Sequence, residues 1–249
     1  MAKADVLKRM LTGPFANCQI RWGLTGTIPK QEFEYMGIKV SLGDVTNKLP
    51  AKELQDKGVL ANCNVNVLQT NDILEFRSYA EELKWLTTDP KRMSWVAQTI
   101  KDISTSGNTL ILVDRISAGE ILEKKIKNSV FIRGATKNTE RKEHYDEVST
   151  AQTKVIIATY GVAAVGINIP RIFNLVLIEP GKSFVRVIQS IGRGIRKAED
   201  KESVAIWDIT SYCKFARRHL TQRKKFYKEA NYPYNIEKID TDLYENTNT

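Results

Sequence analysis

Short runs of apolar, mostly β-branched residues alternate along the chain with longer amphipathic segments. The short runs have the length of buried strands, and the longer segments repeat their apolar positions with a helical period. The predicted strands lie at 18–25, 63–70, 109–114, 130–133, 154–159, 173–179 and 203–208. The predicted helices lie at 91–105, 117–127, 139–150, 183–197 and 211–230. This alternation indicates an α/β fold, a parallel sheet with helices on both faces.

The alternation is interrupted in places that suggest domain boundaries. Residues 30–62 show short runs punctuated by proline and glycine and no sustained period, so we interpret them as a connector. It separates an N-terminal piece, 1–29, from a main domain, 63–232. The tail, 233–249, is polar and acidic, and we expect it to fray from Asn235 onwards.

Composition argues against several classes of protein. No segment reaches the roughly 18 consecutive apolar residues of a membrane-spanning helix, and the N-terminus lacks the apolar run of a secretion signal. Cys18, Cys63 and Cys213 are odd in number and far apart, and the two histidines, His144 and His219, complete no zinc-ligand spacing. We therefore expect a cytoplasmic protein with no membrane partner, no structural metal and no disulfide.

Charge favours a polyanionic partner without proving one. The net charge of +9 suits a nucleic-acid backbone, although many basic proteins bind none. In open α/β sheets, ligands bind beyond the carboxyl ends of the strands, which makes the residues at these ends the first candidates. They are Asp114, Gly134, Thr159, Glu179 and Asp208. On the predicted helix at 211–230, we expect apolar residues in the core (Phe215, Leu220, Phe226) and basic residues outside (Arg217, Arg218, Arg223, Lys224, Lys225).

The predicted helix within 182–197, KSFVRVIQSIGRGIRK, shows the clearest separation of apolar from basic residues. On a helical wheel its apolar residues share a stripe about 100° wide, and its basic residues lie roughly opposite. A solvated basic face is the usual meaning of such a pattern, but it normally includes acids, and none occurs before Glu199. Gly192 and Gly194 each cost a helix roughly 1 kcal/mol and suggest that another group approaches the backbone closely.

The pattern Gln189-x-x-Gly192-Arg193-x-x-Arg196 resembles motif VI of superfamily 2 helicases. The resemblance implies a RecA-like fold, ATP with Mg²⁺ as cofactor, and catalytic roles for Gln189, Arg193 and Arg196. In that family the two arginines reach the γ-phosphate of ATP held by the neighbouring motor domain, and Arg196 is the expected arginine finger. The chemistry fits because a guanidinium stays charged and forks onto phosphate oxygens.

The segment 154–170, KVIIATYGVAAVGINIP, resembles motif V of the same family. The resemblance implies that Thr159 and Gly161 contact the DNA backbone, and that Gly166 and Asn168 touch the nucleotide. Small residues suit this role because backbone N–H groups must approach phosphate closely.

Leu24-Thr25-Gly26-Thr27 resembles motif III, whose residues couple the ATP site to the nucleic-acid site. We therefore expect residues 1–29 to be a remnant of a first motor domain that ends in this motif. Thr25, Gly26 and Thr27 are its expected coupling residues.

The remaining motifs occur in the order of the family. Residues 110–122 lie where motif IV belongs. Residues 132–141, IRGATKNTER, resemble the next strand-to-helix turn, with Arg141 on the following helix. The resemblance implies that Gly134 lies near the DNA track, by which we mean the surface that contacts the DNA backbone. The amino-acid sequences of the connector and the tail also resemble those of one branch of the family. This branch contains the UvsW-type phage recombination helicases and related restriction and repair translocases. DNA rather than RNA as the substrate follows from this likeness alone.

Two motifs of a complete motor are not found in the sequence. The tripeptide Gly-Lys-Ser at 181–183 is no phosphate loop, because Val176 occupies the position of the first glycine. The pair Asp146-Glu147 lies in a polar helix, not at the end of an apolar strand, and is therefore no magnesium motif. We expect the phosphate and Mg²⁺ ligands in an N-terminal motor domain, in cis or in trans, and no ATP hydrolysis by this chain alone.

The sequence therefore predicts the C-terminal half of an ATP-dependent DNA helicase or translocase that unwinds or branch-migrates DNA in recombination and repair. Binding to DNA, branched DNA included, would be independent of sequence. The alternative is a non-catalytic nucleic-acid-binding module or regulator derived from a helicase domain, in which binding tolerates loss of Arg196. A dinucleotide-binding enzyme is disfavoured because no G-x-G-x-x-G joins a first strand to a helix.

Overall fold

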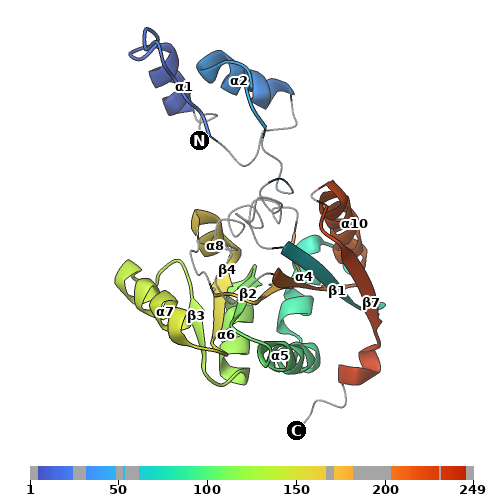
Figure 1. Cartoon of the computed structure of the whole chain (residues 1–249). Helices are drawn as coiled ribbons and strands as arrows, with labels where there is room; N and C mark the ends of the chain where they lie inside the picture. The colour runs from blue at the N-terminus through green and yellow to red at the C-terminus, as the bar shows by residue number, and fades with distance from the viewer. Residues whose placement is uncertain are drawn as a thin grey trace. The chain divides into compact units, whose positions relative to one another are not determined.

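The computed structural model describes residues 5–24, 32–48, 53, 62–166, 171–181, 203–229 and 231–244. Internal contacts divide the chain into two units, Met1–Pro50 and Ala51–Thr249. The described part of the first unit holds two helices, α1 (Asp5–Thr12) and α2 (Glu32–Leu42) (Figure 1).

Two predictions for the first unit are wrong. Residues 18–24 form no strand, although a strand was predicted at 18–25. A strand needs a neighbour to pair its N–H and C=O groups, and the described residues of this unit provide no other strand. The helix α2 lies in the segment that we expected to be an irregular connector.

The second unit contains a seven-stranded sheet in its described residues, and all its strand pairs are parallel. The strand order is β3-β4-β2-β5-β6-β1-β7. The bounds are β1 (Asn62–Thr70), β2 (Thr109–Val113), β3 (Ser129–Ile132), β4 (Val155–Thr159), β5 (Asn174–Ile178), β6 (Ser203–Ser211) and β7 (Tyr234–Ile239). The six strands predicted beyond residue 62 are confirmed, as is the α/β class.

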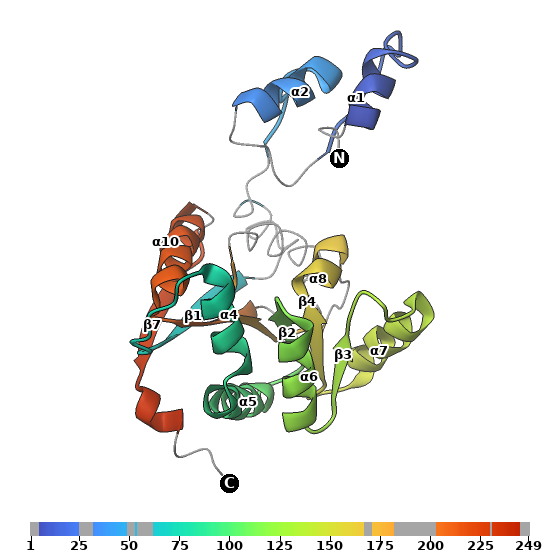
Figure 2. The same ribbon diagram turned by 180° about the vertical axis from the view of Figure 1, so that it is seen from behind.

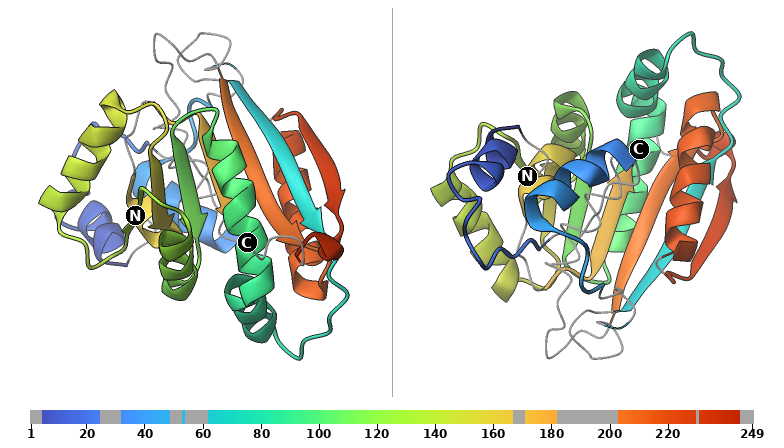
Figure 3. Two further views of the ribbon diagram at one scale, coloured as in Figure 1. Left: turned by 90° about the horizontal axis from the view of Figure 1, so that it is seen from below. Right: turned by 90° about the horizontal axis from the view of Figure 1, so that it is seen from above.

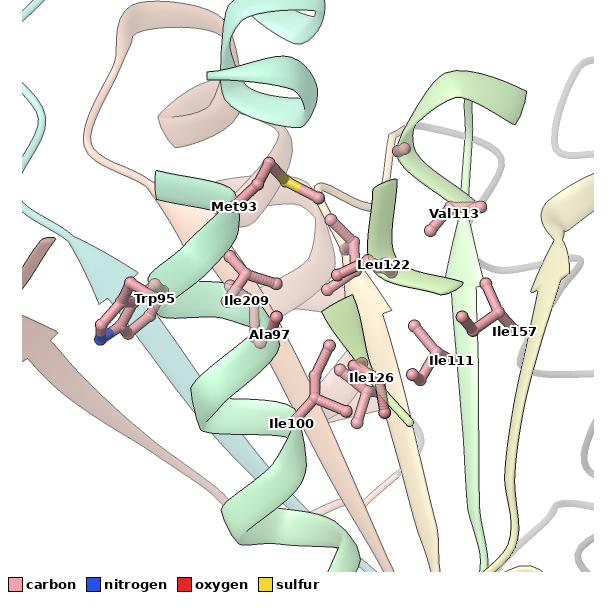
Figure 4. Packing of buried hydrophobic residues seen from close by; sticks show 14 of the residues in the cluster. Met93, Trp95, Ala97, Ile100, Ile111, Val113, Leu122, Ile126, Ile157 and Ile209 are labelled. Carbon is pink, nitrogen blue, oxygen red and sulfur yellow. The ribbon is translucent and has the colours of Figure 1, made fainter. Parts of the chain in front are cut away.

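Helices cover both faces of the sheet (Figures 2 and 3). They are α4 (Tyr79–Thr88), α5 (Pro90–Ser104), α6 (Ile116–Lys125), α7 (Asn138–Thr150), α8 (Tyr160–Gly166) and α10 (Lys214–Glu229). Successive residues of a strand point to opposite faces. In β2, Leu110 and Leu112 belong to a buried cluster that also contains residues of α7, α8 and α10, whereas Ile111 and Val113 belong to a second cluster with residues of α5 and α6. Figure 4 shows the second cluster, in which Ile100 of α5 lies near Ile111 and Ile126.

The prediction that the chain frays from Asn235 is wrong for the described residues. Strand β7 pairs with β1, and the short 3-10 helix η1 (Thr241–Tyr244) follows it. Tyr244 is only 6% exposed, and its hydroxyl donates a hydrogen bond to Asp72 at 3.0 Å. We predicted no strand here, because β7 is an edge strand with mostly exposed residues, and its apolar and polar positions alternate only over 234–237. The helix α4 was not predicted either.

Gly119 offers a test of how closely α6 packs on the sheet. A methyl group there would overlap the ring of Phe131 in β3. We expect Gly119→Ala to destabilise the fold by about 1–3 kcal/mol, because overpacking outweighs the better helix propensity of alanine. The measurement is urea denaturation, with Ser117→Ala on the exposed face of the same helix as the control. Equal stability of the two variants would contradict this packing.

Candidate nucleotide and nucleic-acid site

Three neighbouring strands end together at the residues predicted for the DNA track. Thr159 is the last residue of β4, and Gly134 lies two residues beyond the end of β3. Because Ile132 is level with Ala158, the two chain segments leave the sheet side by side. On the other side of β4, Asp114 follows β2. The structure therefore brings Gly134, Thr159 and Gly161 to adjoining strand ends.

The two glycines leave space at this edge. A Cβ at Gly134 would meet nothing within 4 Å, and one at Gly161 would meet only the hydroxyl oxygen of Thr159, at 4.0 Å. Neither glycine has the positive φ that would require glycine. Packing among the described residues therefore does not require glycine at either position. The Thr159 hydroxyl itself accepts a hydrogen bond from the Val162 N–H at 3.4 Å, in the first turn of α8.

The turn after β3 is held in one conformation by its own residues. The Arg133 N–H donates to the Thr136 hydroxyl at 3.1 Å, and the Thr136 N–H donates to the Arg133 carbonyl at 3.0 Å. From α7, the Arg141 guanidinium donates to the carbonyls of Arg133 and Gly134 at 3.1 and 2.8 Å. Arg141 lies on the following helix, as predicted, and there it supports the backbone that presents Gly134.

The turn that leaves β5 contains a strained glutamate. Glu179 has φ 43°, a left-handed conformation that is costly for a residue with a side chain, and it is 4% exposed. One carboxylate oxygen lies 2.7 Å from the Arg92 guanidinium of α5, and the other accepts the Thr210 hydroxyl at 3.2 Å. These contacts from α5 and β6 stabilise the strained conformation.

A second buried arginine holds the next residue of the same turn. Arg223 of α10 donates to the Asp208 carboxylate at 2.8 and 3.0 Å and to the Pro180 carbonyl at 2.6 Å. The Tyr227 hydroxyl also donates to Asp208, at 2.8 Å. Arg223 is 3% exposed, so the expectation that it lies outside is wrong; its carboxylate partner allows the burial. We call Arg92, Glu179, Asp208 and Arg223 the arginine clamp.

The arginine clamp and its neighbour Asp72 contain one carboxylate more than arginines. Burial raises the pKa of Glu179 to about 7, the guanidinium groups of Arg92 and Arg223 lower it, and the charges of Asp72 and Asp208 raise it. Three carboxylates beside two guanidiniums would leave a net negative charge in a dry environment. A proton on Glu179 near neutral pH removes that excess.

Several predicted site residues lie outside the described residues, namely Gln189, Arg193, Arg196, Asn168, Thr25, Gly26 and Thr27. Gly166 is the last residue of α8. The arginine clamp fixes the turn that precedes 182–197, the segment in which the expected finger lies.

Sequence reasoning missed Arg92, although a signal was present. Arg92 falls on the stripe of the predicted helix at 91–105 that contains Val96 and other apolar residues, and all of these are buried. An arginine on an apolar stripe needs a buried carboxylate partner. Nothing local indicates that Glu179, 87 residues away, is that partner.

The structure describes part of the two sequences that we excluded as phosphate-loop and magnesium motifs; Lys182 and Ser183 lie outside the described residues. Asp146 and Glu147 are exposed in the middle of α7, and Glu147 pairs with Lys154 at 2.8 Å. Val176 is buried at the centre of β5, not in a loop. No group of three or more potential metal ligands occurs among the described residues, and none of the helices described is long and apolar enough to cross a membrane.

The raised pKa of Glu179 predicts a dependence of stability on pH. The folded chain keeps this proton up to about pH 7, whereas the unfolded chain releases it near pH 4.5. The stabilisation from protonation is therefore complete below pH 4.5 and is lost as the pH rises through 7. Glu179→Gln mimics the protonated form, so its stability relative to the wild type should increase across this window, by about 1.4 kcal/mol for each tenfold difference in proton affinity between the folded and unfolded chains.

Urea denaturation at pH 5, 6, 7 and 8 measures this difference. Glu143→Gln, at an exposed position of α7, is the matched control and should show no such trend. A constant difference between Glu179→Gln and the wild type over the whole range would refute the assignment.

Comparison with known proteins finds similarity to helicases in sequence and in fold. Residues 91–198 match the helicase conserved C-terminal domain. The chain is 24% identical over 221 residues to the ATP-dependent DNA helicase UvsW of Enterobacteria phage T4, a match that covers 84% of this chain and 44% of UvsW. The crystal structure of T4 UvsW superposes with a TM-score of 0.63 at 20% identity, covering 83% of this chain and 45% of that one.

Two further solved structures share the fold. A fragment of a putative HsdR subunit of a type I restriction enzyme from Vibrio vulnificus YJ016 gives a TM-score of 0.66 at 19% identity, with 86% of this chain and 43% of that chain covered. S. cerevisiae Dbp5 bound to RNA and ADP BeF3 gives 0.52 at 20% identity, with coverages of 85% and 49%. The chain thus spans less than half the length of each of these relatives. Residues 91–198 thus match the helicase conserved C-terminal domain, and the seven-stranded parallel sheet flanked by helices is the RecA-like fold of these helicase structures.

Proposed function

We propose that this chain is the C-terminal half of an ATP-dependent DNA helicase or translocase. It supplies the arginine finger, Arg196, with Arg193 and Gln189 beside it, to an ATP site whose phosphate and Mg²⁺ ligands belong to the first motor domain. The observation that carries the proposal is the family match, which includes the DNA-track residues Gly134 and Thr159 as well as the finger segment. The biological role would be unwinding or branch migration of DNA in recombination and repair.

The strand ends support a DNA track. Gly134, Thr159 and Gly161 lie on adjoining strands, and the two glycines leave open space beside the backbone. Contacts of backbone N–H groups and a hydroxyl with phosphate carry no base information, so binding would be independent of sequence and sensitive to salt. DNA rather than RNA is favoured by UvsW, a DNA helicase by name, whose match covers 84% of this chain.

The arginine clamp supports the proposed nucleotide chemistry. It fixes the turn at Glu179 and Pro180, immediately before the segment that carries Arg193 and Arg196. An arginine finger stabilises the charge that develops on the γ-phosphoryl group only if it is positioned accurately. Gly166 and Asn168 would touch the nucleotide, and Thr25, Gly26 and Thr27 would couple hydrolysis to the DNA track. Closure and reopening of the two motor domains would then move the DNA.

ATP hydrolysis tests the proposal. We expect no DNA-stimulated hydrolysis by this chain alone, and hydrolysis in its mixture with, or fusion to, a polypeptide that carries the first motor domain. Arg196→Ala should reduce the activity of the mixture about 10³-fold or more, because the finger acts on the transition state. Arg196→Lys should restore little of this activity, since an ammonium cannot donate bidentate hydrogen bonds to two phosphate oxygens as a guanidinium does. The matched control is Arg77→Ala, at an exposed position of the same unit.

The outcomes separate the competing functions. Hydrolysis by the chain alone would show that it holds a phosphate site of its own and would contradict the division of the motor into two halves. DNA binding that is unaffected by Arg196→Ala, without activity in any mixture or fusion, would favour the non-catalytic binding module.

A further inference from the structure

The outer face of α10 is almost entirely basic. Its exposed or half-buried charged residues before Glu229 are Lys214, Arg217, Arg218, Lys224, Lys225 and Lys228. Within the part of the chain that the structure describes, none of these six forms an ion pair with a carboxylate. Like charges three and four positions apart on a helix repel one another, so the surface is unfavourable until an anionic partner binds.

The inner face attaches this helix firmly to the sheet. Leu220 and Tyr227 are buried in the core, and Arg223 pairs with Asp208. The first turn is closed by Glu82 of α4, whose carboxylate accepts the N–H groups of Phe215 and Ala216 at 3.0 and 2.6 Å. Because Glu82 occupies the helix N-terminus, an anionic ligand would bind along the side of α10 and not at its end.

Aromatic rings position the cations of the first two turns. The Arg217 guanidinium lies 5.0 Å from the ring centre of Tyr212, and the Arg218 guanidinium lies 5.9 Å from that of Phe215. The Lys214 ammonium lies 5.7 Å from the centre of the Phe215 ring. Such contacts hold the charged groups over the rings and reduce the entropy lost when they meet phosphates.

The chemistry of the face fits duplex nucleic acid better than a protein or a single strand. Lys225 lies 11 residues after Lys214 on the helix, with Arg218 between them, a distance of about 17 Å at 1.5 Å per residue. Over that length one DNA strand presents about five phosphates. The exposed residues of α10 are all polar or charged, so the apolar centre typical of a protein interface is absent. No aromatic residue is among the exposed residues of α10 itself. The rings beside them, Tyr212 and Phe215, have cations over them, which leaves less of each ring for stacking with unpaired bases.

This face is separate from the DNA track. The helix α10 follows β6, and two strands, β2 and β5, lie between β6 and the track strand β4. Adjacent strands are about 4.8 Å apart, so the two surfaces begin about 14 Å from each other. A strand held at Thr159 and a duplex held on α10 could therefore be bound together.

We propose that the outer face of α10 is a second DNA-binding surface, which holds the backbone of a duplex arm. The identification of the polyanion as DNA rests on the proposed function. Three parts of the inference go beyond the proposed function: the binding of a duplex arm, the role of Lys214, Arg218 and Lys225, and a surface separate from the DNA track.

Fluorescence anisotropy with the full chain tests this surface, using a labelled 20-base-pair duplex and a labelled single strand of the same length. We expect K214Q/R218Q/K225Q to weaken duplex binding at least about tenfold at 100 mM salt and to reduce the salt slope by about 0.9 for each phosphate that the variant no longer neutralises. Binding of the single strand should change by less than about threefold, since the track at Thr159 remains.

Two matched variants control for net charge and for folding. K101Q/K124Q/K127Q removes three exposed charges, from α5, from α6 and from the turn after α6, and should bind duplex like the wild type. K214R/R218K/K225R keeps the charges of α10 and should also bind normally. Circular dichroism and thermal unfolding confirm that each variant folds.

Each contrary result is distinct. Equal losses of duplex affinity in the two glutamine triple variants would show that only net charge matters. Equal losses of affinity for duplex and for single strand would show that α10 belongs to the DNA track. Either result would overturn the inference and leave the proposed function standing. Normal duplex binding by the α10 triple would overturn it as well. A wild-type chain that binds no DNA would count against the proposed function itself.

Discussion

The arginine clamp at the end of β5 is the interaction that links the helices on the two faces of the sheet to a single turn. Arg92 reaches Glu179 from α5, on one face of the sheet, and Arg223 reaches Pro180 and Asp208 from α10, on the other. Buried charges are tolerated only when they are paired, and removal of one partner typically costs about 3–5 kcal/mol. Both helices must therefore lie where their arginines meet these partners, which links the packing of the two faces to a single turn.

This constraint also connects the fold to its proposed function. The turn that the clamp fixes connects β5 directly to the finger segment at 182–197. The same Arg223 anchors α10, so the proposed duplex-binding face and the turn before the finger share one hydrogen-bonded element. Gly134 and Thr159 lie on the neighbouring strands β3 and β4, where their positions depend on the sheet and not on the clamp.

Local patterns in the sequence were sufficient for much of the fold. The inner strands β2, β4 and β5 are buried on both faces, so their apolar runs were unambiguous, and the polar residue after each run marked the strand end. For that reason Gly134 and Thr159 could be placed at the edge of the sheet from sequence alone. The strand predicted at 18–25 has the same local pattern, but the described residues around it offer no strand to pair with.

Long-range partners could not be predicted in the same way. Glu179 resembled any polar residue at a strand end, and its pairing with Arg92 depends on the position of α5 across the sheet. Strand β7 was missed because its stability comes from pairing with β1 and from Tyr244, which reaches Asp72. In each case the stabilising contact joins segments that are distant in the sequence, so the local pattern of apolar and polar residues cannot predict it.

Amide hydrogen exchange of the full chain, with and without a DNA duplex that carries a single-stranded extension, tests the central claim most directly. The account predicts that DNA slows exchange at the turn containing Gly134 and at Thr159–Gly161, where phosphates would meet backbone N–H groups. Exchange at the opposite edge of the sheet, at 105–109 and 126–129, should not change. Protection confined to that opposite edge, or no protection anywhere despite measured binding, would contradict the DNA track and with it the proposed motor function.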